Sequence, residues 1–188
     1  MLQGEKVILR DKQLSDVEND YAWRRDPELA QLDAAPALRL SHREFTAYYG
    51  DELRHPNKKR CRFAIDSQEG KHIGNCMYYD IDAEKGQAEL GILIGDREYW
   101  GKGYGTDAVR TLIEHIYRGT ALKRLYLNTL DWNIRAQLCF QKCGFVACGR
   151  ITKGGNEFVV MELFLSQVKP AGAGAAPSDA GTSLPSTS

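Results

Sequence analysis

The spacing of apolar residues in the first third of the chain predicts three short elements. The aliphatic run at residues 7–10 indicates a strand, and residues 14–25 indicate a helix that ends before a proline. Residues 26–40 hold two prolines and follow no steady period, which predicts a loop. Ser41 followed by Glu44 is the pattern of a capping box, so a second helix is expected to begin there.

Beyond this helix the period shortens from helical to alternating. Residues 61–66, 72–81 and 86–94 each indicate a strand. The stretches that separate them, SQEGK and DAEKG, are rich in turn-forming residues. Three strands joined by short turns predict an antiparallel meander.

The remaining pattern alternates between helices and strands. Apolar residues recur at i, i+1, i+4 and i+5 over 108–117, which predicts an amphipathic helix. Residues 122–130 indicate a strand, and residues 133–142 indicate a helix stopped by Gly144. The last two apolar runs flank the turn KGGN, which predicts a closing hairpin. This order of elements predicts an α/β fold in which helices flank a mixed, mostly antiparallel sheet.

The composition separates one folded domain from a tail. Of the 188 residues, 43% are hydrophobic and 27% are charged, as in a soluble globular protein. Residues 170–188 are rich in Ala, Gly, Ser and Pro and cannot bury enough apolar surface to offset the entropy of ordering. We therefore expect a single domain over residues 1–169 and a disordered tail over residues 170–188.

Charge and cysteine usage narrow the class of protein. Lys plus Arg and Asp plus Glu number 25 each, and this zero net charge argues against a nucleic-acid or membrane-surface binder. No apolar stretch reaches the roughly 20 residues that span a bilayer, and the N-terminus lacks the apolar core of a secretory signal. The five cysteines form no CxxC pair, so free thiols, no metal site and a cytoplasmic location are expected.

Three glycines at alternate positions, Gly101, Gly103 and Gly105, stand between a predicted strand and a predicted helix. Glycine at such a position serves a tight turn, a close contact between helix and sheet, or a phosphate bound to bare backbone N–H groups. The first turn of a helix can bind an anion, because its N–H groups are unpaired and lie at the positive end of the helix dipole. Arg97 and Lys102 add positive charge nearby.

One phosphate ligand that this loop suggests is a dinucleotide, which would make the protein a nucleotide-dependent oxidoreductase. Gly103, Gly105 and Ala108 fit the G-x-G-x-x-A fingerprint, and Asp131 follows at the end of the next strand. The architecture opposes this interpretation, because the chain beyond Asp131 ends in a hairpin and leaves no room for a second parallel half. The pattern of a Walker loop does not occur in the sequence.

The other phosphate ligand is the pyrophosphate of coenzyme A. The stretch YWGKGYGT at residues 99–106, and N-x-R-A followed by K-C-G-F within residues 133–145, resemble the Gcn5-related N-acetyltransferases (GNAT). The sequence is most similar to the branch that acetylates N-terminal amines of ribosomal proteins, spermidine and some antibiotics. The resemblance covers roughly residues 5–165. It implies a GNAT-like fold whose central strands splay apart to admit acetyl-CoA.

The resemblance also implies which residues hold this cosubstrate. Backbone N–H groups of residues 101–106 are implied to bind the pyrophosphate, with Trp100 where the family usually has Gln or Arg. The cofactor-binding residues implied in this way are Ile92, Leu93, Ile94, Trp100, Gly101, Lys102, Gly103, Tyr104, Gly105, Thr106, Asn133, Phe140 and Lys142. Asp107 would repel a phosphate, so its carboxylate is expected to point away. Arg135 is either a phosphate ligand or a residue of the helix surface.

Acetyl transfer to an amine needs a base, because an amine with a pKa near 10.4 is protonated at neutral pH. Glu89 stands where related enzymes place a glutamate base; its alternatives are an exposed strand carboxylate or a binder of a cationic substrate. Many family members protonate the departing thiolate with a tyrosine, but that position here is Phe140. The neighbouring Cys139 and Cys143 are expected to be buried packing residues.

The sequence therefore predicts an acetyl-CoA-dependent N-acetyltransferase that acts on a primary amine. A peptide or protein N-terminus, a polyamine and an aminoglycoside are the acceptors that stay open. The alternative, motivated by Phe140, is an acyl-CoA-binding module with weak or no transferase activity. Of Tyr78 and Tyr79, one is expected to face the core and the other can reach the cleft. The oligomeric state has no signal in the sequence.

Overall fold

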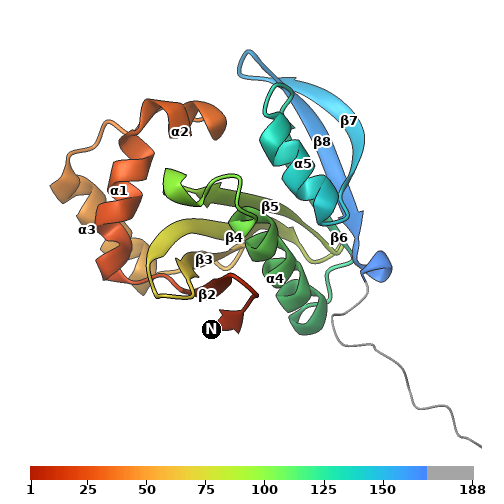
Figure 1. Cartoon of the computed structure of the whole chain (residues 1–188), viewed down its shortest axis with the longest axis horizontal. Coiled ribbons are helices and arrows are strands. Elements are labelled where there is room, and N and C mark those ends of the chain that lie inside the picture. Colours follow the sequence, from red (N-terminus) through yellow and green to blue (C-terminus); the bar gives the residue numbers. More distant parts are fainter. Residues whose placement is uncertain (169–188) are drawn as a thin grey trace, which may run out of the picture.

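A computed structural model gives the structure of residues 1–168, so the tail expected at 170–188 lies outside the described residues. Its centre is an eight-stranded sheet with the order β1-β2-β3-β4-β5-β6-β8-β7 (Figure 1). Among the strands of residues 1–168, the pairing of β5 with β6 is parallel and the others are antiparallel. The strands span Leu2–Gln3 (β1), Val7–Asp11 (β2), Arg60–Ser67 (β3), His72–Asp82 (β4), Gln87–Ile94 (β5), Arg124–Leu130 (β6), Val146–Lys153 (β7) and Asn156–Phe164 (β8).

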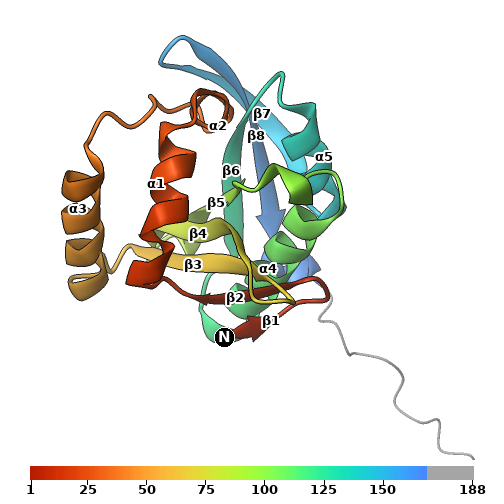
Figure 2. The ribbon, with the colours of Figure 1, turned by 60° about the vertical axis from the view of Figure 1, so that its left-hand side comes forward.

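The helices lie in two groups on either side of this sheet. Figures 1 and 2 show α1, α2 and α3 gathered together, with α4 and α5 on the other face. Their bounds are Val17–Arg25 (α1), Pro27–Leu32 (α2), His42–Arg54 (α3), Tyr104–Gly119 (α4) and Ile134–Lys142 (α5). The predicted α/β architecture, with its meander of β3, β4 and β5 and its closing hairpin of β7 and β8, is confirmed.

The prediction of a loop over residues 26–40 is wrong in part, because α2 begins at Pro27. The Asp26 carboxylate caps this helix and accepts hydrogen bonds from the N–H groups of Glu28 and Leu29, both at 3.0 Å. Proline suits the first position of a helix, where an N–H would have no intrahelical partner. The same proline that ends one helix therefore opens the next. The short strand β1 is a second element that the sequence pattern does not indicate.

The apolar face of α4 fixes this helix on the sheet. Ala108, Val109, Leu112 and Ile116 are fully buried in the main hydrophobic core, so the helical period of the sequence marks the buried face. Full burial of one large aliphatic side chain contributes about 1.5–3 kcal/mol to stability. The buried face of α4 therefore fixes the N-terminus of this helix next to the glycine loop that precedes it.

Charged side chains hold α1 on the opposite face. Arg10 of β2 pairs with Asp16 at 2.7 Å and with Asp66 at 2.6 Å. Lys12 pairs with Asp20 of α1 at 2.8 Å, and its burial lowers the pKa of the Lys12 ammonium. Loss of one partner from a largely buried pair leaves an uncompensated charge. This cluster therefore fixes α1, and α2 directly follows it.

The parallel pairing of β5 with β6 is short. It runs only from Gln87 opposite Arg124 to Glu89 opposite Tyr126. Beyond Glu89, β5 keeps its pairing with β4 as far as Ile94, but its other edge separates from β6. The splayed central strands implied by the family resemblance are therefore present.

Asp107 ties the N-terminal segment to the first turn of α4. Its carboxylate oxygens accept hydrogen bonds from the N–H groups of Glu5 at 3.2 Å, Lys6 at 2.8 Å and Val7 at 3.0 Å. The carboxylate is thus turned toward residues 5–7, in keeping with the expectation that it points away from a phosphate at the glycine loop.

We expect Asp107→Ala to lower the free energy of unfolding by about 1–2 kcal/mol, because three backbone N–H groups lose their acceptor. Glu114→Ala on the same helix is the matched control. Glu114 pairs with the exposed Arg118, and such a pair contributes about 0.3–0.5 kcal/mol. Urea denaturation of both variants measures the difference. Equal losses would show that the Asp107 contacts carry no special weight.

Candidate active site

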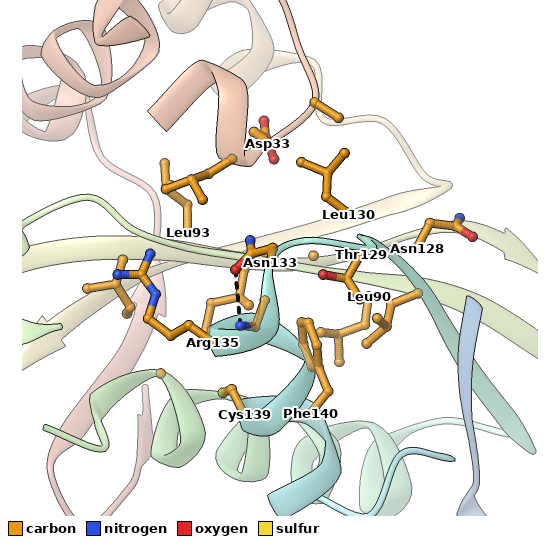
Figure 3. Close-up of a pocket in the computed structure, with 18 of the residues that line it drawn as sticks. Asp33, Leu90, Leu93, Asn128, Thr129, Leu130, Asn133, Arg135, Cys139 and Phe140 are labelled. Atoms are coloured by element: carbon orange, nitrogen blue, oxygen red, sulfur yellow. Dashed lines mark hydrogen bonds between the residues drawn. The ribbon is translucent and has the colours of Figure 1, made fainter. Parts of the chain in front are cut away.

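A cavity of about 820 Å³ occupies the splay between β5 and β6. The glycine loop before α4 and one side of α5 line one part of it, and α2 and the β7–β8 hairpin line another. Figure 3 shows residues of β5, β6 and α5 that converge on this space. The cavity therefore runs from a helix N-terminus, past exposed strand edges, to a mouth formed by elements far apart in the sequence.

The glycine loop forms the first end of the cavity. Gly101 and Gly103 have φ angles of 71° and 89°, which L side chains rarely adopt, so their dihedral angles require glycine. Gly105 has no such requirement, since a Cβ there would lie 3.6 Å from Ile94 Cγ1, an ordinary contact. Its missing side chain instead leaves the first turn of α4 open to the cavity, where the N–H groups of Gly105 and Thr106 have no intrahelical acceptor. This arrangement fits an anion such as a pyrophosphate.

Two residues of the loop contribute no side chain to the cavity lining. Lys102 is exposed, and the Tyr104 ring packs edge-on against Tyr99 with ring centroids 4.8 Å apart. Arg97, expected to add free positive charge, pairs instead with Asp26 at 2.9 Å and with Glu28 at 2.7 Å. That expectation is wrong because the sequence pattern did not predict α2. Glu28 lies in this helix and Asp26 caps it, and both carboxylates pair with Arg97.

Trp100 and α5 form the wall beside the loop. The Trp100 indole donates a hydrogen bond from Nε1 to the Ile94 carbonyl oxygen at 2.6 Å, which occupies that acceptor at the end of β5. Asn133 caps α5 by accepting a hydrogen bond from the Ala136 N–H at 3.2 Å (Figure 3). Asn133 thus lines the cavity and also begins the helix. The predicted site residues that line the cavity are Glu89, Ile92, Leu93, Ile94, Trp100, Gly101, Gly103, Gly105, Thr106, Asn133, Phe140 and Lys142.

Polar side chains gather where β5 and β6 still pair. The Glu89 carboxylate accepts a hydrogen bond from the Asn128 side-chain amide at 2.9 Å. Tyr79 lies opposite Glu89 in the β4–β5 register and also lines the cavity, whereas Tyr78 is buried in the core. Burial and then the nearby Glu89 carboxylate raise the pKa of Tyr79 well above its usual value. Tyr79 therefore keeps its proton at neutral pH, next to a carboxylate able to accept one.

On α5, Phe140 occupies the position where many family members have a tyrosine. Phe140 is buried, packs against Phe145 with ring centroids 5.8 Å apart, and has no proton to give. Cys139 is half-buried and lines the cavity, so the expectation that it is simply a buried packing residue is wrong. Its thiol lies 3.5 Å from the Thr106 hydroxyl. A hydrogen bond from Cys143 is the main cause that lowers the pKa of Cys139, to about 7.

The second end of the cavity is built by α2 and the hairpin. Leu29, Leu32 and Asp33 lie on one side, and Lys153 and Asn156 on the other. Figure 3 places Asp33 across the cavity from the strand β6. Sequence reasoning missed Asp33, and the only local signal for it is the Asp-Pro pair that opens α2.

Residues 1–168 contain neither a metal-binding cluster nor a helix that could span a membrane. No group of three His, Cys, Asp or Glu side chains in this part of the chain is arranged to hold a metal ion. The same residues contain no helix with the length and apolar character needed to cross a membrane.

The acetyltransferase (GNAT) domain family matches residues 6–146, so the chain belongs to this family of N-acetyltransferases. A probable spermine N(1)-acetyltransferase from Bacillus subtilis subsp. natto is 34% identical over 100 residues. That alignment covers 50% of this chain and 66% of the relative, so just under two thirds of the relative is matched.

Solved structures share the fold. A spermidine N-acetyltransferase from Vibrio cholerae, in complex with CoA and spermine, has a TM-score of 0.76 at 20% identity and covers 86% of this chain and 96% of its own. The aminoglycoside acetyltransferase AAC(6')-Ib with ribostamycin and coenzyme A has a TM-score of 0.73 at 20% identity, and covers 90% and 100%. The predicted family and fold are confirmed. The finer likeness to the ribosomal-protein branch stays a prediction, because these relatives are named for polyamines and an aminoglycoside.

We expect iodoacetamide to label Cys139 faster at neutral pH than it labels an ordinary thiol, because the lowered pKa of Cys139 supplies thiolate there. Saturating CoA should slow this labelling at least tenfold by filling the cavity. Cys148, exposed on β7 and outside the cavity, is the internal control. Peptide mapping by mass spectrometry follows both sites, and equal labelling of Cys139 with and without CoA would contradict the position of the cosubstrate.

Proposed function

We propose that the protein transfers the acetyl group of acetyl-CoA to a primary amine of a small molecule that carries several positive charges. The observation that carries this proposal is the single cavity that joins an anion-binding helix N-terminus to a cluster of Glu89, Tyr79 and Asn128. The polyamine and aminoglycoside specificity in the names of the relatives supports it.

In this proposal coenzyme A occupies the cavity from the glycine loop to Glu89. The open first turn of α4 suits its pyrophosphate. The edge of β5 released by the splay, which includes Ile92 and Leu93, offers backbone groups to the amides of the pantetheine arm, as an added strand would. The thioester then lies toward the end of the splay, near Glu89.

Glu89 is the proposed base. An amine with a pKa near 10.4 costs about 4–5 kcal/mol to deprotonate at pH 7. In the proposed reaction Glu89, directly or through a water, takes one proton from the ammonium. The neutral nitrogen attacks the thioester carbonyl carbon, the carbon–sulfur bond breaks, and the nitrogen loses its second proton to water as the amide forms. The leaving thiolate takes a proton from water or from the Tyr79 side of the cavity, since Phe140 has none to give.

We expect Glu89→Gln to reduce turnover more than tenfold while the Kd for acetyl-CoA is unchanged, because the amide cannot accept the ammonium proton. The matched control is Glu84→Gln, an exposed residue of the β4–β5 turn outside the cavity. Thiol release measures turnover, and isothermal titration calorimetry measures the Kd. Normal turnover of the Glu89 variant would remove this residue from the mechanism.

A second carboxylate favours a polycationic acceptor. Asp33 lines the cavity on the α2 side, and its side chain is 54% exposed. Its partner Arg24 lies at 3.4 Å and is itself 44% exposed, so the pair is weak and open to competition from another cation. An acceptor with two ammonium groups can place one near Glu89 and the other near Asp33.

We expect Asp33→Asn to raise KM for α,ω-diamines about tenfold with little change in kcat, because it removes a charge that binds only the distal ammonium. Monoamines of the same chain length should be poor substrates that respond to the substitution less than twofold. The measurement is acetylation kinetics over a series of diamines of increasing length. A diamine preference that survives the substitution would contradict this role for Asp33.

The second candidate is an acyl-CoA-binding module, which the buried Phe140 favours. The two functions differ in one observation. Calorimetric binding of acetyl-CoA without thiol release, over diamines, aminoglycosides and N-terminal peptides, would select the module. Thiol release with any of these acceptors selects the enzyme, and the peptides test the ribosomal-protein alternative.

A further inference from the structure

Two cysteines lie four residues apart at the end of α5, where this helix packs against α4. Cys139 Sγ is 3.5 Å from the Thr106 hydroxyl oxygen, and the Cys143 thiol donates to the Thr106 carbonyl oxygen at 3.5 Å. Residues four apart in a helix are neighbours on its surface. Both sulfur atoms therefore contact one residue in the first turn of α4, and they lie side by side at the glycine-loop end of the cavity.

The two thiols differ in access. Cys139 is half-buried and lines the cavity, and Figure 3 shows it beside Phe140 on α5. Cys143 is not among the residues that line the cavity, and it packs against the main hydrophobic core. A small polar reagent that enters the cavity therefore reaches Cys139 first. Cys143 is then the neighbour that can react with an oxidised Cys139 sulfur.

The surroundings of Cys139 favour its thiolate. A Cβ atom at Gly105 would lie 3.7 Å from the Cys139 sulfur, so this sulfur faces the N-terminus of α4, the positive end of the helix dipole. The hydrogen bond from Cys143 is the main cause that lowers the pKa of Cys139 and raises the pKa of Cys143. The charges of Lys142 and Arg110 lower the pKa of Cys139 further. The accessible sulfur is thus the better nucleophile, and its neighbour keeps its proton.

We propose that Cys139 and Cys143 form a modification site for hydrogen peroxide, at which a disulfide forms when the cosubstrate is absent and then weakens its binding. The Cys139 thiolate attacks one peroxide oxygen, the O–O bond breaks and hydroxide leaves; the sulfur is oxidised to a sulfenic acid and the peroxide is reduced. The Cys143 sulfur then attacks the Cys139 sulfur. The S–S bond forms, the S–O bond breaks, and the departing hydroxide takes the Cys143 proton to become water. In total, two thiols and one peroxide give one disulfide and two waters.

Closure of this disulfide requires the end of α5 to move. Side chains four apart on a helix have Cβ atoms about 5–6 Å apart, whereas a disulfide holds them about 3.5–4.5 Å apart. Cys143 is the C-cap residue of α5, and Gly144 follows it with a φ angle of 95°, so the movement falls on the helix end and on a conformationally permissive glycine.

This movement acts on the cosubstrate site through Thr106. It draws the two sulfur atoms together and away from Thr106, whose N–H group belongs to the open first turn of α4. The inference rests on the proposed function only for the ligand of that turn, the pyrophosphate of acetyl-CoA. A strained disulfide is readily reduced by thiols, so the modification is reversible.

Peroxide treatment followed by peptide mapping tests the chemistry. We expect a disulfide between Cys139 and Cys143, with the other thiols free to be alkylated. In Cys143→Ser the reaction should stop at the Cys139 sulfenic acid, which dimedone traps. Cys148→Ser, at an exposed position outside the cavity, is the control and should form the disulfide as the unchanged protein does. Mapping that finds no bond between Cys139 and Cys143 overturns the inference.

Calorimetric titration tests the consequence for binding. Acetyl-CoA is the probe, because it has no free thiol that could reduce the disulfide or consume peroxide. We expect oxidation to weaken its binding at least tenfold, and dithiothreitol to restore the Kd of the untreated protein. Saturating acetyl-CoA should slow disulfide formation at least tenfold, since it covers Cys139. The Kd of Cys139→Ser should be the same before and after peroxide.

The results separate this inference from the proposed function. A disulfide that leaves the Kd for acetyl-CoA unchanged overturns the inference alone. A loss of binding that circular dichroism traces to global unfolding of the oxidised protein also contradicts it. Failure of the reduced, folded protein to bind acetyl-CoA would instead overturn the proposed function.

Discussion

The early end of the parallel pairing between β5 and β6 is the constraint on which the site depends. A parallel pair normally continues, since each further residue adds hydrogen bonds, but here it stops at Glu89 opposite Tyr126. The sheet tolerates the separation because β5 remains paired with β4 and β6 with β8. The released edges must find other partners or water. A ligand with its own amides is a partner of the right shape, so the split in the sheet is also the binding slot.

Local sequence signals predicted the parts of the fold whose causes are local. The apolar face of α4, the capping box at Ser41 and the hairpin turn each occupy a few adjacent residues. The site itself depends on contacts between distant segments. Glu89 was foreseen by resemblance, but Asn128 and Asp33 reach the cavity only through the strand order and through α2. The apolar period of a single segment cannot predict which residues of other segments will line the same cavity.

The helix α2, which the sequence pattern did not predict, changes the positive charge available at the glycine loop. Arg97 is adjacent to the loop in sequence, yet Asp26 and Glu28 neutralise it, and Asp26 also caps α2. The ion pairs therefore join the loop to the acceptor side of the cavity. Arg135 is distant in sequence, and stacking on Trp100, worth about 0.5–2 kcal/mol, orients it there. Proximity along the chain therefore did not predict that carboxylates of a distant segment pair with Arg97.

Carboxylates in the proposed acceptor site act in two opposed ways. A carboxylate close to an ammonium stabilises its charged form, which helps binding but hinders the deprotonation that attack requires. One group cannot do both well. The structure separates two candidates: Asp33 is in contact with solvent at the α2 side, while Glu89 is partly buried beside Asn128 and Tyr79. On the proposed function, the outer carboxylate holds an ammonium that stays charged, and the inner one takes a proton from the amine that reacts. A molecule with a single amine gains only one of these interactions, so the arrangement itself favours acceptors with two.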